Sequence, residues 1–363
     1  MSKVYNFCAG PAMLPAAVLE KAQQELLDWN GQGTSVMEVS HRGKPFMDLA
    51  AKSERNLRTL LQVPDNYKVL FMHGGGRGQF AAVPYNLTKA GDCAAFIDTG
   101  VWSKKAQEEA ANLIQTDVVA KSSKNEQGLW QVPQQQLIEV ATNAKYLHCC
   151  PNETIEGLEM LHAPQASNGA PLVADLSSTI LSRPINVSDY GIIYAGAQKN
   201  IGPSGLAVAI VREDLIGNAR KETPTIFDYA LTAKNDSMYN TPPTYSWYLA
   251  GMVFEWLLEQ GGLTAMEKRN AEKAALLYNV IDSSSFYKNQ VALNSRSKMN
   301  VPFQLANAEL DGLFLELANA AGLRALKGHK LVGGMRASIY NAMPLEGVQA
   351  LVDFMQEFER TKA

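Results

Sequence analysis

Short apolar segments bounded by turn residues recur between about residues 68 and 211. Near-continuous apolar runs of this length are typical of strands in a sheet that is covered on both faces. Longer amphipathic segments, 104–114 and 134–142, lie between several of them and are predicted to be helices. The alternation predicts an α/β domain with a largely parallel sheet. Its recognisable strands are 68–72, 93–97, 144–148, 171–174, 192–194 and 207–211, the last of which is a candidate for an antiparallel member.

The pattern changes after Pro242-Pro243, where long helical periodicities replace the short strands. Helices are predicted at 247–260, 265–281, 310–321 and 345–360, and strands at 299–303 and 335–340. This part therefore predicts a smaller α+β domain. The length of 363 residues agrees, because a single hydrophobic core rarely keeps growing to that size.

Composition narrows the possible functions. The net charge is −3 and the basic residues are scattered, so no nucleic-acid partner is expected. No uncharged apolar run reaches membrane-spanning length, and the amino terminus has no apolar signal region, so no membrane partner is expected either. Four irregularly spaced cysteines favour the reducing cytoplasm. His148 lies beside Cys149-Cys150, but no second His/Cys pair has zinc spacing, so no metal is expected.

One lysine is distinguished by its surroundings. Lys199 follows the apolar strand 192–194 and lies among small residues, and Asp175 ends an apolar strand upstream. A lysine that attacks an aldehyde needs a fixed, partly desolvated amine, and a pyridine ring that accepts electrons needs a carboxylate to hold its nitrogen protonated. The two residues are candidates for the Schiff-base lysine and the ring-nitrogen partner of pyridoxal phosphate. A surface lysine in a loop is the alternative for Lys199 taken alone.

A glycine-rich stretch from His73 to Gln79 follows the strand 68–72 and precedes a helical pattern. Free amides at a helix start bind phosphate, and glycines allow its close approach. The stretch lacks the Gly-Lys-Ser/Thr of a P-loop, and Gln79 stands where the dinucleotide fingerprint requires glycine. A phosphate-binding loop and a plain tight turn both remain open for this stretch by itself.

The glycine loop, Asp175 and Lys199 can converge, because ligands bind at the carboxyl ends of the strands in open α/β sheets. Here the chain resembles the phosphoserine aminotransferases, class-V members of the fold-type-I pyridoxal phosphate enzymes. The resemblance extends end to end and rests on the motifs at 6–12, 38–43, 73–79, 150–157, 175–178, 195–205, 239–243 and 333–338. It implies a large domain, 16–258, with a mostly parallel seven-stranded sheet, and a small α+β domain, 1–15 and 259–363.

The resemblance also implies roles toward the cofactor. The amides of Gly76 and Arg77 and the side chain of Gln198 would hold its phosphate, and Trp102 would stack on its ring. A core tryptophan at a helix start is the alternative for Trp102. The remaining contacts would be Thr154 to the ring hydroxyl, Asp175 to the ring nitrogen, and Asn240 and Thr241 of a neighbouring subunit to the phosphate. The active site would then require a homodimer.

The resemblance implies two substrates, glutamate and a phosphorylated 2-oxo acid. Each carries an α-carboxylate and a second anion, so cations are needed to bind them. Arg336 is the candidate for the α-carboxylate, which its planar fork can bind through both oxygens. For the distal phosphate or the γ-carboxylate of glutamate the resemblance implies His41, Arg42, Arg77, His329 and Lys330. Family members commonly carry arginine in place of Lys330, and lysine keeps the charge without the fork. Cys8, where serine is frequent, is a second departure and affects no expected role.

The expected reaction is phosphoserine transamination in serine biosynthesis. L-Glutamate and 3-phosphohydroxypyruvate would give 2-oxoglutarate and O-phospho-L-serine, and the related 3-hydroxy-2-oxo-4-phosphonooxybutanoate of pyridoxine biosynthesis is an additional expected substrate. Lys199, released from its Schiff base by glutamate, would act as general base, with ping-pong kinetics.

Three other functions fit the sequence less well. A cysteine desulfurase usually needs a mobile cysteine late in the chain, and none follows Cys150. A phosphate-ligand binding module without chemistry does not explain Lys199 together with Asp175. Another fold-type-I transaminase, such as alanine–glyoxylate or serine–pyruvate aminotransferase, is the main alternative. A substrate with one carboxylate would not require the additional cations His41, Arg42, His329 and Lys330.

Overall fold

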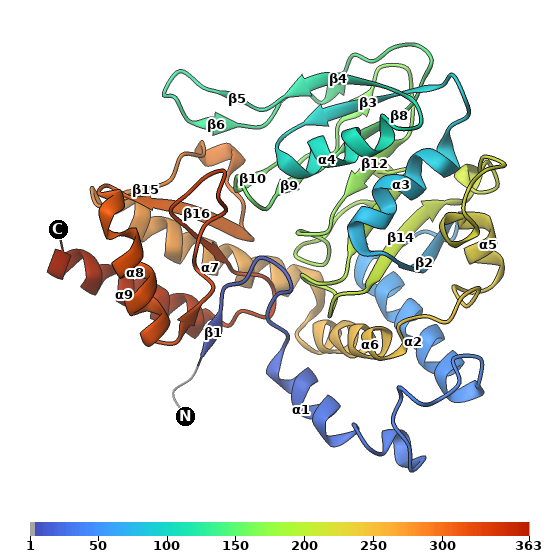
Figure 1. The fold of residues 1–363 in the computed structure, drawn as a ribbon, viewed down its shortest axis with the longest axis horizontal. Coiled ribbons are helices and arrows are strands. Elements are labelled where there is room, and N and C mark those ends of the chain that lie inside the picture. Colours follow the sequence, from blue (N-terminus) through green and yellow to red (C-terminus); the bar gives the residue numbers. More distant parts are fainter. Residues whose placement is uncertain (1–3, 363) are drawn as a thin grey trace.

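A seven-stranded sheet forms the centre of the larger part of the protein (Figure 1). The structure, a computed structural model, describes residues 4–362. The strands, in their order across the sheet, are β2 (Tyr67–His73), β14 (Leu206–Arg212), β13 (Ile192–Gly196), β12 (Leu172–Asp175), β8 (Ala144–Cys149), β3 (Cys93–Asp98) and β4 (Gln115–Lys121).

The sheet is mostly parallel, as the sequence predicts. Only β14 runs antiparallel to its neighbours β13 and β2, which confirms the antiparallel strand expected near 207–211. The edge strand β4 was not among the predicted strands. Its sequence, Gln-Thr-Asp-Val-Val-Ala-Lys, is largely polar because an edge strand is only partly covered. The α/β, fold-type-I architecture is confirmed.

Two helical layers cover the sheet. Alternate side chains of β2 point to opposite faces: Val69 and Phe71 pack in one apolar cluster and Leu70 and Met72 in another. The first cluster includes helices α2 (Lys44–Leu61) and α6 (Thr244–Glu259), and the second includes α3 (Gly75–Leu87), α4 (Val101–Ala110) and α5 (Tyr229–Lys234). Burial on both faces explains why the inner strands are apolar at nearly every position.

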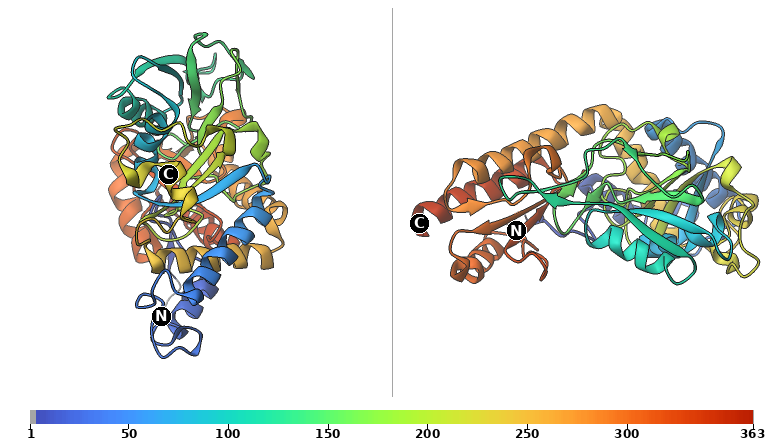
Figure 2. Two further views of the ribbon diagram at one scale, coloured as in Figure 1. Left: turned by 90° about the vertical axis from the view of Figure 1, so that its right-hand side faces the viewer. Right: turned by 90° about the horizontal axis from the view of Figure 1, so that it is seen from above.

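The second part of the chain has its own apolar cluster. A small antiparallel sheet contains β15 (Tyr287–Lys288), β16 (Asn300–Leu305) and β18 (Met335–Ser338), and α7 (Gly262–Ser283), α8 (Asp311–Ala320) and α9 (Leu345–Lys362) pack around it. The amino-terminal β1 (Tyr5–Asn6) pairs with β17 (Leu323–Arg324), so the amino-terminal segment belongs to this part of the structure. Figure 2 shows this part beside the larger one.

The separate apolar clusters of the two parts support the two predicted domains. The domain bounds, 16–258 for the large domain and 1–15 with 259–363 for the small one, remain a proposal. Tyr5 and Phe7 belong to the smaller cluster, and α7 enters both, with Leu263 and Met266 in the larger and Leu277 in the smaller. Residues 1–3 and 363 of the predicted small domain lie outside the described residues. The amino-terminal segment continues through α1 (Ala16–Gln24) and a 3-10 turn (Trp29–Gly31) toward α2.

The helix predicted at 134–142 is wrong. The segment is extended and includes β7 (Leu137–Ile138), which pairs in parallel with β11 (Gln165–Ala166). Backbone partners come from that neighbour rather than from a helical turn, because Gln165 N donates to Gln136 O and Ser167 N donates to Ile138 O. The further short strands are β5 (Ser123–Lys124), β6 (Trp130–Gln131), β9 (Asn152–Glu153) and β10 (Leu158–Glu159). The other predicted helices are present within a few residues of their expected bounds.

Candidate active site

A cavity of about 230 Å³ lies where β2, β12 and β13 end. Its walls bring together residues that are up to 125 positions apart in the sequence. They include Gly74, Gly75, Gly76, Arg77, Trp102, Asp175, Gln198 and Lys199. The structure thus places six of the predicted site residues, Gly76, Arg77, Trp102, Asp175, Gln198 and Lys199, around one space.

Lys199 is half-buried at the edge of this cavity. Its Nζ donates to Thr154 Oγ1 at 2.8 Å. The same Nζ lies 5.8 Å from the centroid of the Trp102 ring, and the guanidinium carbon of Arg77 lies 5.8 Å from that centroid as well. The amine, the indole and the guanidinium therefore surround the same space.

Asp175, the last residue of β12, is buried beside this space. Its Oδ1 accepts hydrogen bonds from Ser177 Oγ at 2.5 Å and Ser177 N at 2.9 Å. Both bonds use Oδ1, so Oδ2 is left for a ligand. Burial raises the pKa of Asp175, while the Ser177 hydroxyl and the charge of Lys199 oppose that rise. A cationic ring nitrogen would form the ion pair that this carboxylate lacks among the described residues.

The glycine loop ends β2 and begins α3. Gly74 and Gly75 have φ of +85° and +60°, which glycine adopts without strain, and Gly74 at the N-cap has no side chain to bind the first amides of the helix. At Gly76 a Cβ atom would lie 3.2 Å from Ser177 Oγ. The uncapped helix start therefore faces the cavity with backbone amides, the arrangement that binds phosphate.

The cavity lining fits pyridoxal phosphate, with free helix-start amides for the phosphate and the buried Asp175 carboxylate for the ring nitrogen. Trp102 Nε1 and Arg336 Nε are buried without a hydrogen-bond partner among the described residues. Arg336 Nη1 donates to Thr154 O at 3.4 Å, so this side chain reaches the same turn that contacts Lys199. Burial lowers the pKa of Arg336. A partly desolvated guanidinium whose Nε has no partner among the described residues is suited to bind a carboxylate.

Other predicted site residues lie outside this cavity. Asn240 and Thr241 are exposed, and Asn240 Nδ2 lies 3.4 Å from His73 Nε2 at the end of β2. The predicted anion-binding residues His41, Arg42, His329 and Lys330 do not line the cavity either. Burial and the charge of Arg42 lower the pKa of His41. The roles of all six remain predictions.

Sequence reasoning assigned no role to several polar residues that shape this site. Ser177 binds Asp175 and also accepts from Gly196 N at 2.9 Å, which joins β12 to β13. Glu153 and Glu156 bind the first amides of α4, which carries Trp102. All three lie inside motifs that carry the family resemblance, but only the tertiary contacts reveal what they touch.

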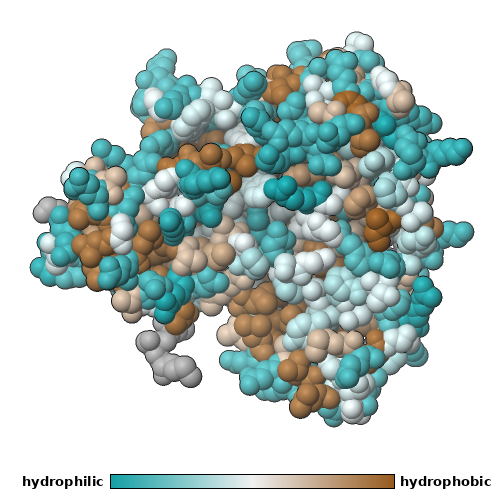
Figure 3. Space-filling view, viewed as in Figure 1, coloured by the Kyte–Doolittle hydropathy of each residue, from teal (hydrophilic) through white to brown (hydrophobic). Residues whose placement is uncertain are grey.

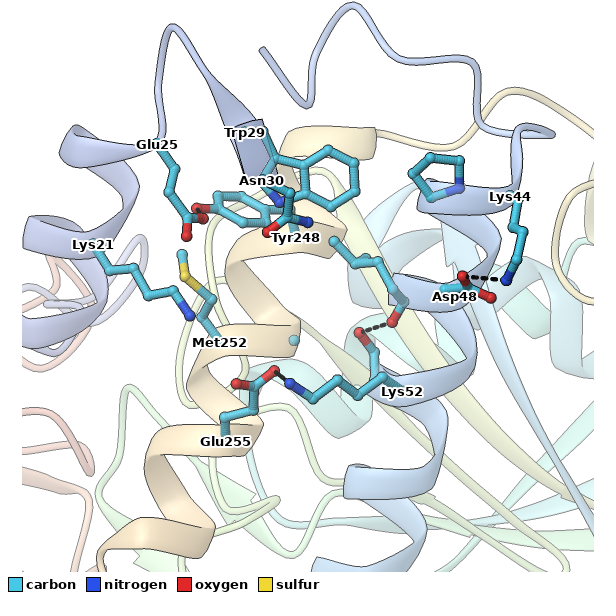
Figure 4. Close-up of a pocket in the computed structure, with 14 residues that line it drawn as sticks. Lys21, Glu25, Trp29, Asn30, Lys44, Asp48, Lys52, Tyr248, Met252 and Glu255 are labelled. Carbon is cyan, nitrogen blue, oxygen red and sulfur yellow. Dashed lines mark hydrogen bonds and ion pairs between the residues drawn. The ribbon is translucent and has the colours of Figure 1, made fainter. Parts of the chain in front are cut away.

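A larger cavity, of about 480 Å³, lies away from these residues between α1, α2 and α6 (Figure 4). Its charges are compensated internally: Lys44 Nζ lies 2.7 Å from Asp48 and Lys52 Nζ lies 2.8 Å from Glu255. Tyr248 Oη donates to Glu25. No predicted site residue lines it, and its paired charges give no directed set of donors for an anion.

Two further observations concern the described residues alone. Between residues 4 and 362, no three histidine, cysteine, aspartate or glutamate side chains are grouped so that they could hold a metal ion. Across the same range, none of the helices combines the length and apolarity needed to cross a bilayer.

Comparison with known proteins identifies the family. The family model for aminotransferase class-V matches residues 4–351. Phosphoserine aminotransferase from Bacillus circulans subsp. alkalophilus is 45% identical, with a TM-score of 0.95 and 99% of each chain covered. The pyridoxal phosphate-bound phosphoserine aminotransferase from Trichomonas vaginalis is 40% identical, with a TM-score of 0.91, 98% of this chain covered and 100% of the other.

An alanine–glyoxylate aminotransferase from Nostoc sp. is 17% identical over 99% of this chain and 96% of the other, with a TM-score of 0.76, and shows only that the fold is shared. The two phosphoserine aminotransferases are 40–45% identical to this chain over nearly the whole length, which is a much closer similarity in sequence as well as in fold. The chain belongs to the aminotransferase class-V family, as a pyridoxal phosphate-dependent aminotransferase that resembles the phosphoserine aminotransferases from end to end.

Proposed function

We propose that this aminotransferase exchanges the amino group between L-glutamate and 3-phosphohydroxypyruvate, giving 2-oxoglutarate and O-phospho-L-serine. The observation that carries the proposal is the 40–45% identity to phosphoserine aminotransferases over nearly the whole chain. Amination of 3-hydroxy-2-oxo-4-phosphonooxybutanoate, and roles in serine and pyridoxine biosynthesis in the cytoplasm, extend the same proposal.

In this proposal the cofactor is held by the residues around the cavity. Among the lining residues, the amides of Gly76 and Arg77 and the Gln198 side chain bind the phosphate and Trp102 stacks on the ring. Thr154, which contacts Lys199, binds the ring hydroxyl. Thr154 Oγ1 already accepts a hydrogen bond from Lys199, and its own hydrogen is free to be donated. Asn240 and Thr241 reach the phosphate from a second subunit, for which their exposure leaves them available.

When bound, pyridoxal phosphate supplies an aldehyde that carries the amino group and a ring that accepts electrons. The protein then has to move one proton in each direction. Lys199 Nζ takes the α-proton of glutamate as general base and delivers it as general acid. Asp175 Oδ2 holds the proton of the ring nitrogen, and Ser177 fixes the orientation of that carboxylate through Oδ1.

Substrate orientation is assigned to the cations. Arg336 binds the α-carboxylate, and its fork is fixed at one end by Thr154 O. His41, Arg42, Arg77, His329 and Lys330 bind the distal phosphate or the γ-carboxylate of glutamate. The first substrate leaves its amino group on the enzyme and departs as an oxo acid before the second substrate binds at the same anion sites, so the expected kinetics are ping-pong.

Absorption spectroscopy tests the proposal. The visible band of the bound cofactor should disappear when glutamate is added to the purified protein and return with 3-phosphohydroxypyruvate. Lys199→Ala should catalyse neither change. If the band returns only with pyruvate or glyoxylate, the transaminase assignment stands and the phosphorylated substrate is wrong.

A further inference from the structure

The turn formed by residues 152–156 touches the residues on which the proposed chemistry depends. Glu153 accepts hydrogen bonds from the start of α4, and Thr154 contacts both Lys199 and Arg336. Two residues on, Glu156 also reaches the start of α4. A five-residue segment thus joins the helix that carries Trp102 to the amine and the guanidinium of the site.

The two carboxyl groups bind all three leading amides of α4. Glu153 Oε2 accepts from Trp102 N at 2.8 Å, and Glu153 Oε1 accepts from Ser103 N at 2.8 Å and from Ser103 Oγ at 2.8 Å. Glu156 Oε1 accepts from Val101 N at 3.1 Å. These amides have no carbonyl partner within the helix, so the carboxyl groups determine where its first turn lies.

This arrangement is more demanding than ordinary helix capping. One serine or aspartate suffices to cap a helix, whereas here two carboxyl groups from a distant segment are brought together. Glu153 is fully buried, and Glu156 Oε2 is buried without a partner among the described residues. Burial raises the pKa of both carboxyl groups, and the charge of Glu156 adds to the rise at Glu153.

Gly100, which precedes α4, is shaped to admit both carboxyl groups. A Cβ atom there would lie 2.7 Å from the carboxyl carbon of Glu156 and 2.8 Å from that of Glu153. Its φ is close to 180°, which any residue can adopt, so glycine is needed for space rather than for backbone conformation. Gly100, Glu153 and Glu156 together therefore determine the position of the first turn of α4.

We propose that Glu153 and Glu156 are positioning residues, which fix the Trp102 indole against the cofactor ring in register with Lys199 and Arg336. The inference rests on the proposed stacking role of Trp102. Neither carboxyl group touches the reacting atoms; both act through the first turn of α4. A displacement of the indole would leave the cofactor bound but misaligned, and misalignment by about 1 Å can reduce a rate on the order of 100-fold.

The test compares Glu153→Gln and Glu156→Gln with Asp228→Asn, all as purified holoenzymes. Asp228 caps α5 by accepting from Ala230 N and Leu231 N, so this control also removes a carboxylate from a helix start. We expect the two glutamine variants to keep the cofactor, to lose at least half of its induced visible circular dichroism, and to lose about tenfold or more in kcat with KM for glutamate changed less than about threefold. Asp228→Asn should leave all three quantities unchanged.

A double-mutant cycle separates positioning from stability. In a Trp102→Ala background, Glu153→Gln should have little further effect on the circular dichroism or kcat, because the residue through which it acts is gone. Full additivity would overturn the proposal, and so would a lower melting temperature with unchanged circular dichroism and kcat.

Gly100→Ala gives a second route to the same displacement should Glu153→Gln fail to fold. It should reproduce the loss of circular dichroism, and an unchanged spectrum in the folded variant would count against the proposal. The spectrum is read without substrate, so it does not depend on which oxo acid is used. Absence of the cofactor band in the unmodified protein would instead remove the proposed cofactor site itself.

Discussion

Among single residues, Lys273 is placed least like an ordinary lysine. It is buried on α7, and its Nζ donates to the carbonyl oxygens of Ile339, Tyr340 and Met343 at 3.0, 2.7 and 3.1 Å. The described residues provide no carboxylate within ion-pair distance of it. Burial lowers its pKa to about 7, with a smaller contribution from Arg269. Through these bonds Lys273 holds the segment that follows β18, the strand of Arg336.

Lys273 should make stability depend on pH. Between pH 7 and the ordinary lysine pKa, the unfolded chain binds the proton and the folded chain does not, so stability rises with pH across this window. Each unit of pKa depression is equivalent to about 1.4 kcal/mol. The melting temperature of the unmodified protein relative to Lys273→Met should therefore increase from pH 7 to pH 10. Lys268→Met, an exposed change on the same helix, should show no such trend, and a flat difference for Lys273→Met would contradict the assignment.

Lys330 allows a gain-of-affinity prediction. An arginine there would bind phosphate through two parallel hydrogen bonds, which an ammonium cannot form. Lys330→Arg should lower KM for 3-phosphohydroxypyruvate about two- to fivefold, with kcat nearly constant. Steady-state kinetics measure both, with Lys327→Arg in the same loop as the matched control. An equal decrease in KM for Lys327→Arg would mean that arginine anywhere in this loop improves binding, and would contradict a specific role of position 330.

At the scale of elements, the loop between β17 and β18 is held by its glycines. Gly334 has φ of +55°, and a Cβ atom there would lie 2.6 Å from Phe303 O on β16. Gly334 O accepts from Gly328 N at 2.8 Å, so the loop carrying His329 and Lys330 closes on itself against the small sheet. Glycine is required here by both conformation and space.

Gly334→Ala should therefore displace the loop without affecting the cofactor. We expect KM for the phosphorylated oxo acid to rise several-fold while the visible band of the cofactor is unchanged, since strain of about 1–3 kcal/mol falls on the loop alone. Gly312→Ala in α8, where a Cβ atom has open space, is the control and should be neutral. A variant that binds the oxo acid normally would show that this loop does not reach the substrate.

At the scale of the whole molecule, solvent-exposed apolar side chains support the proposed homodimer. Leu27 is 84% exposed and Met37 is 52% exposed, in the segment between α1 and α2. In Figure 3, apolar atoms gather in the lower part of the face, where Figure 1 shows α1. Exposed apolar groups of this kind are typical of protein interfaces. A second copy of this chain would cover them and bring Asn240 and Thr241 to the neighbouring site.

Mixed dimers test the shared active site. Lys199→Ala and the double variant Asn240→Ala/Thr241→Ala should each have little activity alone. After the two are unfolded and refolded together, about half of the dimers are mixed and each contains one intact site, so about a quarter of the unmodified activity should return. If every site is built from one subunit, mixing restores nothing. Refolding each variant separately gives the baseline.

The sequence by itself determined the fold class, the inner strands and the cofactor. Inner strands such as β13 are apolar at every position because both faces are buried, and this can be read without a structure. Edge elements cannot be predicted in this way, because β4 is largely polar and β7 forms only where β11 lies beside it. Lys199 and Asp175 could be named as candidates because the proposed chemistry requires definite residues at strand ends, and the structure places both at one cavity.

Only the tertiary structure decided which polar groups support that chemistry. Ser177, Glu153 and Glu156 are small parts of family motifs in the sequence, and nothing in their spacing shows that one orients Asp175 and two hold the start of α4. Periodicity reports which face of an element is buried, because burial follows the repeat of the backbone. A hydrogen bond between residues 50 positions apart depends instead on how the elements pack, and that is set by the whole chain.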